Sequence, residues 1–265
     1  MIPVKVIESV HLHHPPFLEA VALGQVPGYS IVNKFGETPD IDAADGFETI
    51  WDGTAVWAAP ANAETHTFTT NAADILGGAG AEIMEIQGLG PGFNLQSESV
   101  ILNGAGGVTT SGRYRIIFRM KVIQSNNGAN DTMNVGAINA VADVSGTTTA
   151  TIQVGNNQTL MAIYQVPAGC EALLLDFYMH EGGAKKAASL EGRLWVQPDG
   201  QAPQLKEKFS THEDGDSSLV RVHRAPPHYG EKSLIYMDVD TDTDNSVVQG
   251  GFDLLLRNDD LAEDH

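Results

Sequence analysis

Apolar and basic residues alternate with a period of two in the segment 113–123, which carries the clearest pattern in the chain. Its apolar residues fall on one face of an extended backbone and are Tyr114, Ile116, Phe118, Met120 and Val122. Its basic residues fall on the opposite face and are Arg113, Arg115, Arg119 and Lys121. This period is that of a strand with one buried face. We therefore predict a strand whose basic face contacts acidic partners, either in the same domain or on a neighbouring subunit.

Short β-branched or aromatic runs continue through the rest of the chain from Tyr29 onward. Clusters of Gly, Asn, Asp and Pro separate them, as is typical of β-sandwiches and barrels. The other predicted strands cover residues 55–58, 65–70, 82–87, 98–102, 134–144, 148–154, 159–166, 172–180, 189–196, 219–223, 233–239 and 247–256. No long helical pattern lies between them, which argues against a doubly wound fold and an α/β barrel.

The first 30 residues have a different pattern. Pro15 and Pro16 precede apolar residues at 17, 18, 21 and 22, and Gly24 follows, which predicts a short amphipathic helix. We expect residues 1–30 to form an extended docking arm that carries this helix. Residues 31–265 are expected to form a single all-β domain, an antiparallel, jelly-roll-like β-sandwich. The arm docks either on a neighbouring subunit or on its own domain, and the sequence favours neither.

Composition and charge narrow the possible classes of protein. With 265 residues and 42% hydrophobic content, the chain is able to bury a core without disulfides. Its single cysteine, Cys170, excludes an intramolecular disulfide and a Cys-rich zinc site. The net charge of −19 repels nucleic-acid phosphates, and no window approaches 18 consecutive apolar residues. We expect neither a nucleic acid nor a membrane as partner, and we find no secretory signal pattern.

The sequence contains none of the arrangements that indicate a catalytic centre. A Gly-x-Ser-x-Gly elbow and a phosphate-binding glycine loop are both missing. We therefore expect a protein that is not an enzyme, with no catalytic residue and no cofactor. The weak calcium candidate comprises Asp238, Asp240, Asp242 and Asp244. Counted from Asp240, an EF-hand would need Gly and Glu at the positions of Asn245 and Gly251, so we expect a solvated acidic hairpin instead.

A series of short strings occurs in a fixed order along the chain. They are ETIWDG (48–53), VWAAP (56–60), AAD (72–74) with GA (80–81), IQGL (86–89), ESVILNG (98–104), GNNQT (155–159), VPAG (166–169) and GFDL (251–254). In this order the chain resembles a family of structural proteins of tailed bacteriophages over most of residues 30–257. The resemblance implies a virion component without enzymatic activity, and it carries over no functional residue.

Decoration proteins of phage heads commonly form trimers at local three-fold axes. Our leading hypothesis is a homotrimeric capsid decoration or cement protein, assembled in the host bacterial cytoplasm, that binds the major capsid protein on the head surface and stabilises the shell. The candidate interface residues are Phe17, Leu18, Val21, Tyr29, Phe35, Arg113, Arg115, Arg119 and Lys121.

Two other functions stay open at this point. One is a tail, collar or fibre component that recognises a host surface glycan through an exposed platform of Trp51, Trp57 or Trp195. These tryptophans would otherwise belong to the core or to a sheet face. The other is a carbohydrate-active enzyme, which would need two carboxylates facing each other across a sugar-lined cleft.

Overall fold

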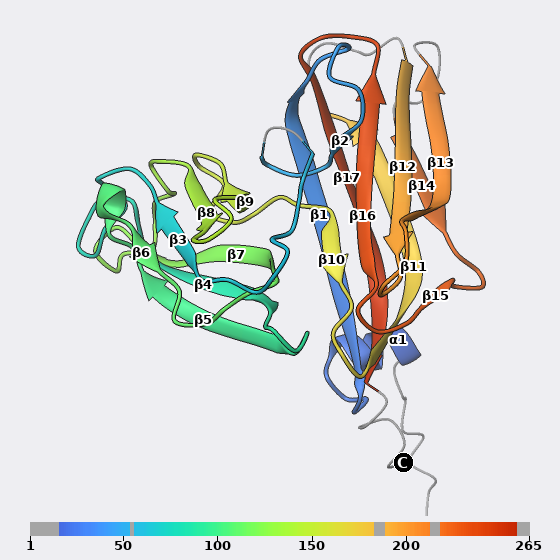
Figure 1. The fold of residues 1–265 in the computed structure, drawn as a ribbon, viewed down its shortest axis with the longest axis horizontal. Helices are drawn as coiled ribbons and strands as arrows, with labels where there is room; N and C mark the ends of the chain where they lie inside the picture. The colour runs from blue at the N-terminus through green and yellow to red at the C-terminus, as the bar shows by residue number, and fades with distance from the viewer. Residues whose placement is uncertain (1–15, 54–55, 183–188, 213–217, 259–265) are drawn as a thin grey trace, which may run out of the picture.

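The computed structural model describes residues 16–53, 56–182, 189–212 and 218–258, so most of the predicted arm, residues 1–15, lies outside the described part. The described residues form two β-rich bodies that lie side by side (Figure 1). The larger body contains both ends of the described chain, and the smaller body contains the middle. The chain thus leaves the larger body after β2 and returns to it at β10.

Two five-stranded antiparallel sheets make up the larger body. One sheet has the order β1-β17-β11-β14, with β15 also paired to β11, and the other has the order β10-β16-β12-β13, with β2 paired to β16. Its strands are β1 (Tyr29–Ile41), β2 (Glu48–Thr49), β10 (Ile163–Gln165), β11 (Cys170–Glu181), β12 (Ser189–Gln197), β13 (Gln204–His212), β14 (Ser218–Val222), β15 (His228–Tyr229), β16 (Leu234–Thr241) and β17 (Ser246–Asn258).

These two sheets pack against each other through apolar side chains. Phe177 of β11 and Phe209 of β13 bring their ring centroids to 5.7 Å across the interior. At one side of the larger body the edge strands are β1 and β10, and at the other side they are β14 and β13. There Arg221 of β14 and Glu207 of β13 form an ion pair of 3.0 Å. Within the described residues β14 pairs only with β11, and its Val220 and Val222 are 69% and 70% exposed.

The smaller body contains a four-stranded sheet, β6-β3-β8-β9, and a three-stranded sheet, β5-β4-β7. Its elements are β3 (His66–Thr69), β4 (Ala81–Leu89), β5 (Leu95–Ile101), the 3₁₀ turn η1 (Gly104–Gly106), β6 (Val108–Thr109), β7 (Ile116–Ser125), β8 (Ile138–Ala142) and β9 (Thr148–Ile152). Its buried residues, such as Phe68 and Met84, belong to the same apolar cluster as Phe252 and Leu254 of the larger body. The two bodies therefore share a continuous core.

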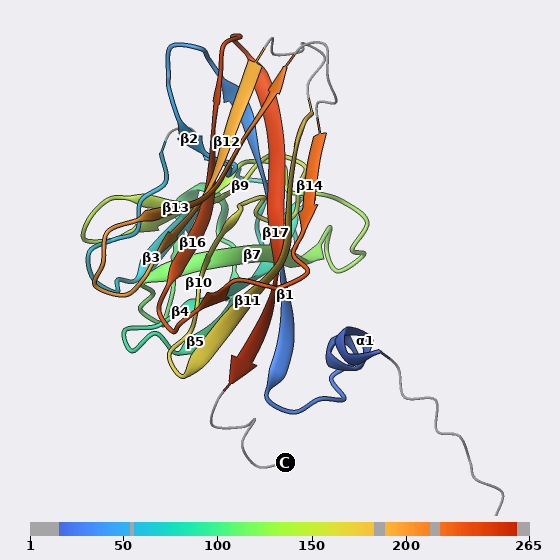
Figure 2. The same ribbon diagram turned by 90° about the vertical axis from the view of Figure 1, so that its right-hand side faces the viewer.

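The predicted helix is present as α1 (Phe17–Ala22). Figure 2 shows it beside the lower end of β1. The Phe17 ring meets the Tyr29 ring edge-on at 5.4 Å, and Val21 is buried. The helix thus contacts its own chain, while Phe17 and Leu18 remain 51% and 42% exposed. No helix in the described part of the chain has the length and apolarity needed to cross a membrane.

The predicted all-β, antiparallel class is confirmed, and so is the strand with a buried apolar face, since Ile116 and Met120 of β7 are fully buried. Four sheets are present among the described residues, whereas two were expected. The strand predicted at 55–58 is wrong, because residues 56–58 are irregular. Strands β1 and β13 were missed, since polar residues interrupt or mask their alternation.

Gly36 lies where β1 crosses the two segments that connect the bodies. A Cβ atom at this position would lie 2.5 Å from both the Ile50 oxygen and the Ala162 nitrogen. Those two atoms form a backbone hydrogen bond of 2.9 Å. Only a residue without a side chain fits against this bond, so β1 requires glycine here.

We expect Gly36→Ala to destabilise the protein, because backbone atoms of two other segments would have to move. The cost should be about 2 kcal/mol, which lowers the midpoint of thermal unfolding by about 5 °C. Gly230→Ala is the matched control, since no atom lies within 4 Å of a Cβ at Gly230. Thermal melts followed by circular dichroism measure both. Equal midpoints for the two variants would contradict the close approach at Gly36.

Candidate functional site at the junction of the two bodies

Two short segments of chain connect the bodies, and they pair with each other. Trp51 and Met161 form an isolated antiparallel bridge. Next to it, the Asp52 amide donates to the Leu160 oxygen at 2.9 Å, and the Leu160 amide donates to the Asp52 Oδ2 at 3.2 Å. The point of departure and the point of return of the inserted residues are therefore held together.

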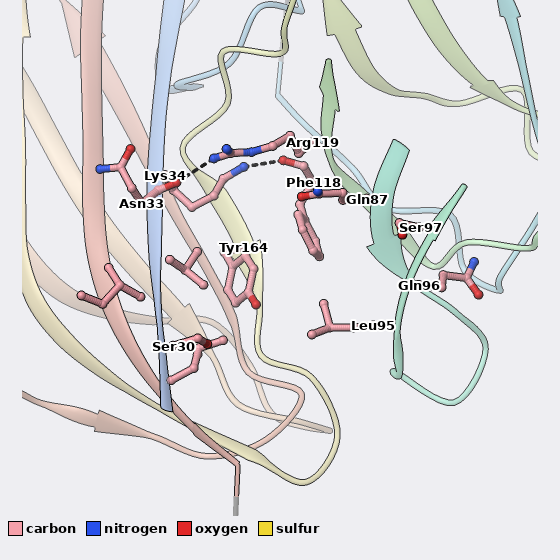
Figure 3. A pocket seen from close by; sticks show the side chains of 13 residues that line it. Ser30, Asn33, Lys34, Gln87, Leu95, Gln96, Ser97, Phe118, Arg119 and Tyr164 are labelled. Atoms are coloured by element: carbon pink, nitrogen blue, oxygen red, sulfur yellow. Dashed lines mark hydrogen bonds between the residues drawn. The ribbon is translucent and has the colours of Figure 1, made fainter. Parts of the chain in front are cut away.

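A second connection joins the edge strand β1 to β7 of the smaller body. The Lys34 ammonium donates to the Phe118 oxygen, and the Arg119 guanidinium donates to the Asn33 oxygen at 2.8 Å. Each strand thus supplies one side-chain donor and one backbone acceptor, as Figure 3 shows. We call these four residues the clasp. It links strands 84 and 86 residues apart in sequence.

An irregularity in β7 provides the acceptor for Lys34. In the β4–β7 ladder, Gln87 pairs with Arg119 and the next residue, Gly88, pairs with Ile117. Phe118 is therefore the extra residue of a β-bulge, and a bulged residue is left unpaired in the ladder. Its oxygen is available to accept from Lys34. The same bulge turns Ile117 and Phe118 both into the interior, where each is buried.

A pocket of about 550 Å³ lies beside the clasp, between the bodies. Figure 3 shows Lys34 and Arg119 along one end of it, with Tyr164, Leu95 and Ser30 further down. Its walls come from β1, β4, β5, β7, β10 and β17. The lining residues are Ser30, Ile31, Val32, Asn33, Lys34, Gln87, Leu95, Gln96, Ser97, Phe118, Arg119, Tyr164 and Leu256.

The pocket is lined by two basic side chains, Lys34 and Arg119, and by no acidic one, although the chain carries a net charge of −19. Lys34 is only 2% exposed. Burial, and then the neighbouring charge of Arg119, lower the pKa of Lys34 well below its ordinary value. Neither Lys34 nor Arg119 forms an ion pair with a described carboxylate. The nearby Glu85 instead pairs with Lys121 at 3.1 Å.

The predicted row of basic residues is divided among different contacts in its own chain. Arg113 donates to the Ala63 oxygen at 3.0 Å. Arg115 lies over the Phe93 ring at 4.5 Å. Lys121 pairs with Glu85, and of the row only Arg119 reaches the pocket. Sequence reasoning missed Lys34, because nothing in its local sequence marks it as buried.

The other predicted interface residues lie on or near β1 and α1. Phe17 and Leu18 are largely exposed, Val21 is buried, and Tyr29 is half-buried beneath Phe17. Phe35 is half-buried and follows Lys34 on β1. Successive residues of a strand point to opposite faces, so Phe35 lies on the face away from the pocket.

The four aspartates of the calcium candidate do not converge. Asp238 accepts two hydrogen bonds from Arg193, at 2.8 and 2.7 Å, and one from Trp195 at 3.0 Å. Asp240 accepts from the amide of the next residue, Thr241. Asp242 accepts from the amide of Ser189, and Asp244 accepts from the amide of Ala43. Within the described residues no group of three or more His, Cys, Asp or Glu side chains is placed to hold a metal ion.

The three tryptophans do not share one surface. Trp51 and Trp57 are 4% and 8% exposed, so they belong to the core. Trp195 is half-buried and stacks on Tyr236, with ring centroids 6.4 Å apart. The Arg193 guanidinium lies over the Phe47 ring at 3.1 Å and over the Trp195 ring at 5.0 Å. Of the aromatic platform considered for a glycan-binding component, only Trp195 remains partly exposed, next to Tyr236 on the same sheet face.

No protein family model and no curated protein matches this chain. A solved structure of the infectious bursal disease virus Gt strain is similar over 95% of this chain and 89% of that chain, at 8% sequence identity. The TM-score of that comparison is 0.13, which supports no conclusion about fold or function.

Asp52 is the buried acid at the connection between the bodies. It is 1% exposed, and its Oδ1 has no hydrogen-bond partner among the described residues. Burial raises the pKa of Asp52 to about 6, and the hydrogen bond from the Leu160 amide offsets only part of this effect. Ionisation of Asp52 therefore weakens the folded state.

The free energy of unfolding should carry this effect as a pH dependence. Folded Asp52 keeps its proton up to about pH 6, whereas an ordinary aspartate releases it near 3.8. The stabilisation is complete below the lower value and is lost as the pH rises through the higher one. In Asp52→Asn the side chain stays neutral, so at pH 7.5 the variant should exceed the parent by on the order of 2 kcal/mol. At pH 4 the two proteins should be similar. Urea denaturation at both pH values measures the difference, and a constant offset would contradict this role.

Proposed function

We propose that this chain is a non-enzymatic structural protein of a tailed-bacteriophage virion, a homotrimeric decoration or cement protein on the head surface that binds the major capsid protein. The ordered strings in the sequence suggest the virion. The observation that carries the proposal on the structural side is the strand order of the larger body.

That order supports a jelly roll. Numbered in chain order, its eight principal strands are β1, β10, β11, β12, β13, β14, β16 and β17. One sheet then runs first, eighth, third, sixth, and the other runs second, seventh, fourth, fifth. This is the order of two interlocked Greek keys, an architecture found in viral capsid proteins and also in lectins. Fold alone does not assign a function, so the proposal needs the sequence resemblance as well.

The exposed face of α1 supports attachment through the N-terminal arm. The helix buries Val21 against its own chain but leaves Phe17, Leu18 and, just beyond it, Leu23 exposed by 51%, 42% and 66%. Grouped exposed apolar residues mark surfaces that bind other proteins. In the proposed virion this face lies on the shell or on a neighbouring copy.

A second candidate function is a tail, collar or fibre component that recognises a host glycan. The observation that favours it is the half-buried pair Trp195 and Tyr236, since stacked aromatic rings on a sheet face are suited to bind sugars. Lectins also use the jelly roll. We rank this function second because Trp51 and Trp57 are buried and add nothing to such a surface.

The number of copies per virion separates the two functions. Quantitative mass spectrometry of purified particles, with the major capsid protein as internal reference, should give hundreds of copies for a head decoration protein, because the icosahedral shell repeats its local three-fold axes. A dozen copies or fewer would favour the tail or collar. Absence from the particles would contradict both.

Attachment through α1 is tested with the double variant Phe17→Ser, Leu18→Ser, which leaves the buried Val21 in place. We expect it to fold and form trimers like the parent but to lose binding to purified heads that lack this protein. Val220→Ser is the control, because Val220 is also an exposed apolar residue but lies on β14, remote from α1 in the sequence. Co-sedimentation with heads measures binding. Normal binding by the double variant would refute attachment through this face.

A further inference from the structure

We propose that the pocket beside the clasp binds an acidic sugar, a pyranose whose carboxylate lies against Lys34 and Arg119. This goes beyond the proposed function, because a shell protein needs no small-molecule pocket to bind a capsid. Three observations carry it: the uncompensated positive charge, the unused hydrogen-bond donors and the mixed walls of the pocket.

The two basic side chains in the pocket are suited to bind an anion. Lys34 and Arg119 lie close together without an ion pair to a described carboxylate. Two neighbouring cations at a poorly hydrated site repel each other and are stabilised by an anion between them. Asp253 does not supply this anion. Its carboxylate accepts a hydrogen bond from the side-chain amide of Asn33 at 2.5 Å, on the face of β1 away from Lys34.

The same two side chains have donors to spare. A guanidinium carries five N–H groups and an ammonium carries three. Arg119 uses one of them on the Asn33 oxygen, and Lys34 uses one on the Phe118 oxygen. Arginine is the residue best suited to bind a carboxylate through two parallel hydrogen bonds. The clasp therefore fixes the positions of Lys34 and Arg119 and leaves most of their N–H donors available to a ligand.

The rest of the pocket fits the body of a sugar better than a simple ion. Its volume of about 550 Å³ exceeds the needs of an inorganic anion and falls in the usual range of small-molecule sites. Gln87, Gln96 and Ser97 line one wall with groups that hydrogen-bond hydroxyls. Leu95 and Ile31, which are 57% and 36% exposed, supply apolar surface for the C–H face of a pyranose ring.

Isothermal titration calorimetry on the full chain tests this proposal with three probes: methyl glucuronide, methyl glucoside and acetate. We expect methyl glucuronide to bind at least tenfold more tightly than either the neutral glycoside or acetate, and its binding to weaken as salt is raised. Equal binding of acetate would overturn the sugar, and equal binding of the glucoside would overturn the carboxylate site. No binding of any probe would overturn the proposal.

Variants locate the binding in the pocket. Arg119→Gln and Lys34→Met should each reduce the affinity for methyl glucuronide at least tenfold. Lys121→Gln is the matched control, because Lys121 lies on the same strand but pairs with Glu85 outside the pocket, and it should bind like the parent. Should a clasp variant fail to fold, Leu95→Trp fills the pocket from a side chain that is 57% exposed and should block binding without touching the clasp. Parental affinity in Leu95→Trp or in Arg119→Gln would refute the site.

Discussion

The arrangement of the two bodies depends on the removal of one lysine side chain from water. Lys34 lies on an edge strand, where its ammonium would normally be solvated, but the smaller body covers it and leaves it 2% exposed. Desolvation of an ammonium costs several kcal/mol unless hydrogen bonds replace the lost water. The Phe118 oxygen, freed from its ladder by the bulge in β7, provides one such bond. The position of the smaller body and the protonation of Lys34 are thus coupled, since movement of either body would change the environment of the amine.

Around that contact the chain connects the bodies at three places. The segments at Trp51 and Met161 pair with each other, and Gly36 packs on the hydrogen bond between Ile50 and Ala162. The clasp lies just before Gly36 on β1. The Gly36 contact and the clasp both involve β1, and the bridge between Trp51 and Met161 joins the two connecting segments. Together these contacts resist separation and rotation of the insertion. The pocket beside the clasp is accordingly preformed, so the proposed binding of a ligand would require little ordering of its walls.

Local pattern in the sequence predicts most strands but not the junction. Strand β7 and the short helix α1 could be predicted because each has a clear apolar face in the sequence. Strand β1 could not be predicted in this way, because two of its buried positions hold polar residues, Lys34 and Thr38. The division into two bodies, the bulge at Phe118 and the convergence of Lys34 with Arg119 depend on pairing between strands far apart in the sequence. Those contacts carry no local periodicity, so neither the pocket nor its charge could be predicted.

The insertion also changes how the larger body can associate. A sandwich with two free sides could add a strand at each and grow into a filament without end. Here the side formed by β1 and β10 faces the smaller body, and the side of β14, which pairs only with β11 among the described residues, stays accessible. Among the described residues, strand addition to the larger body is therefore confined to one side, where β14 ends one sheet and β13 ends the other.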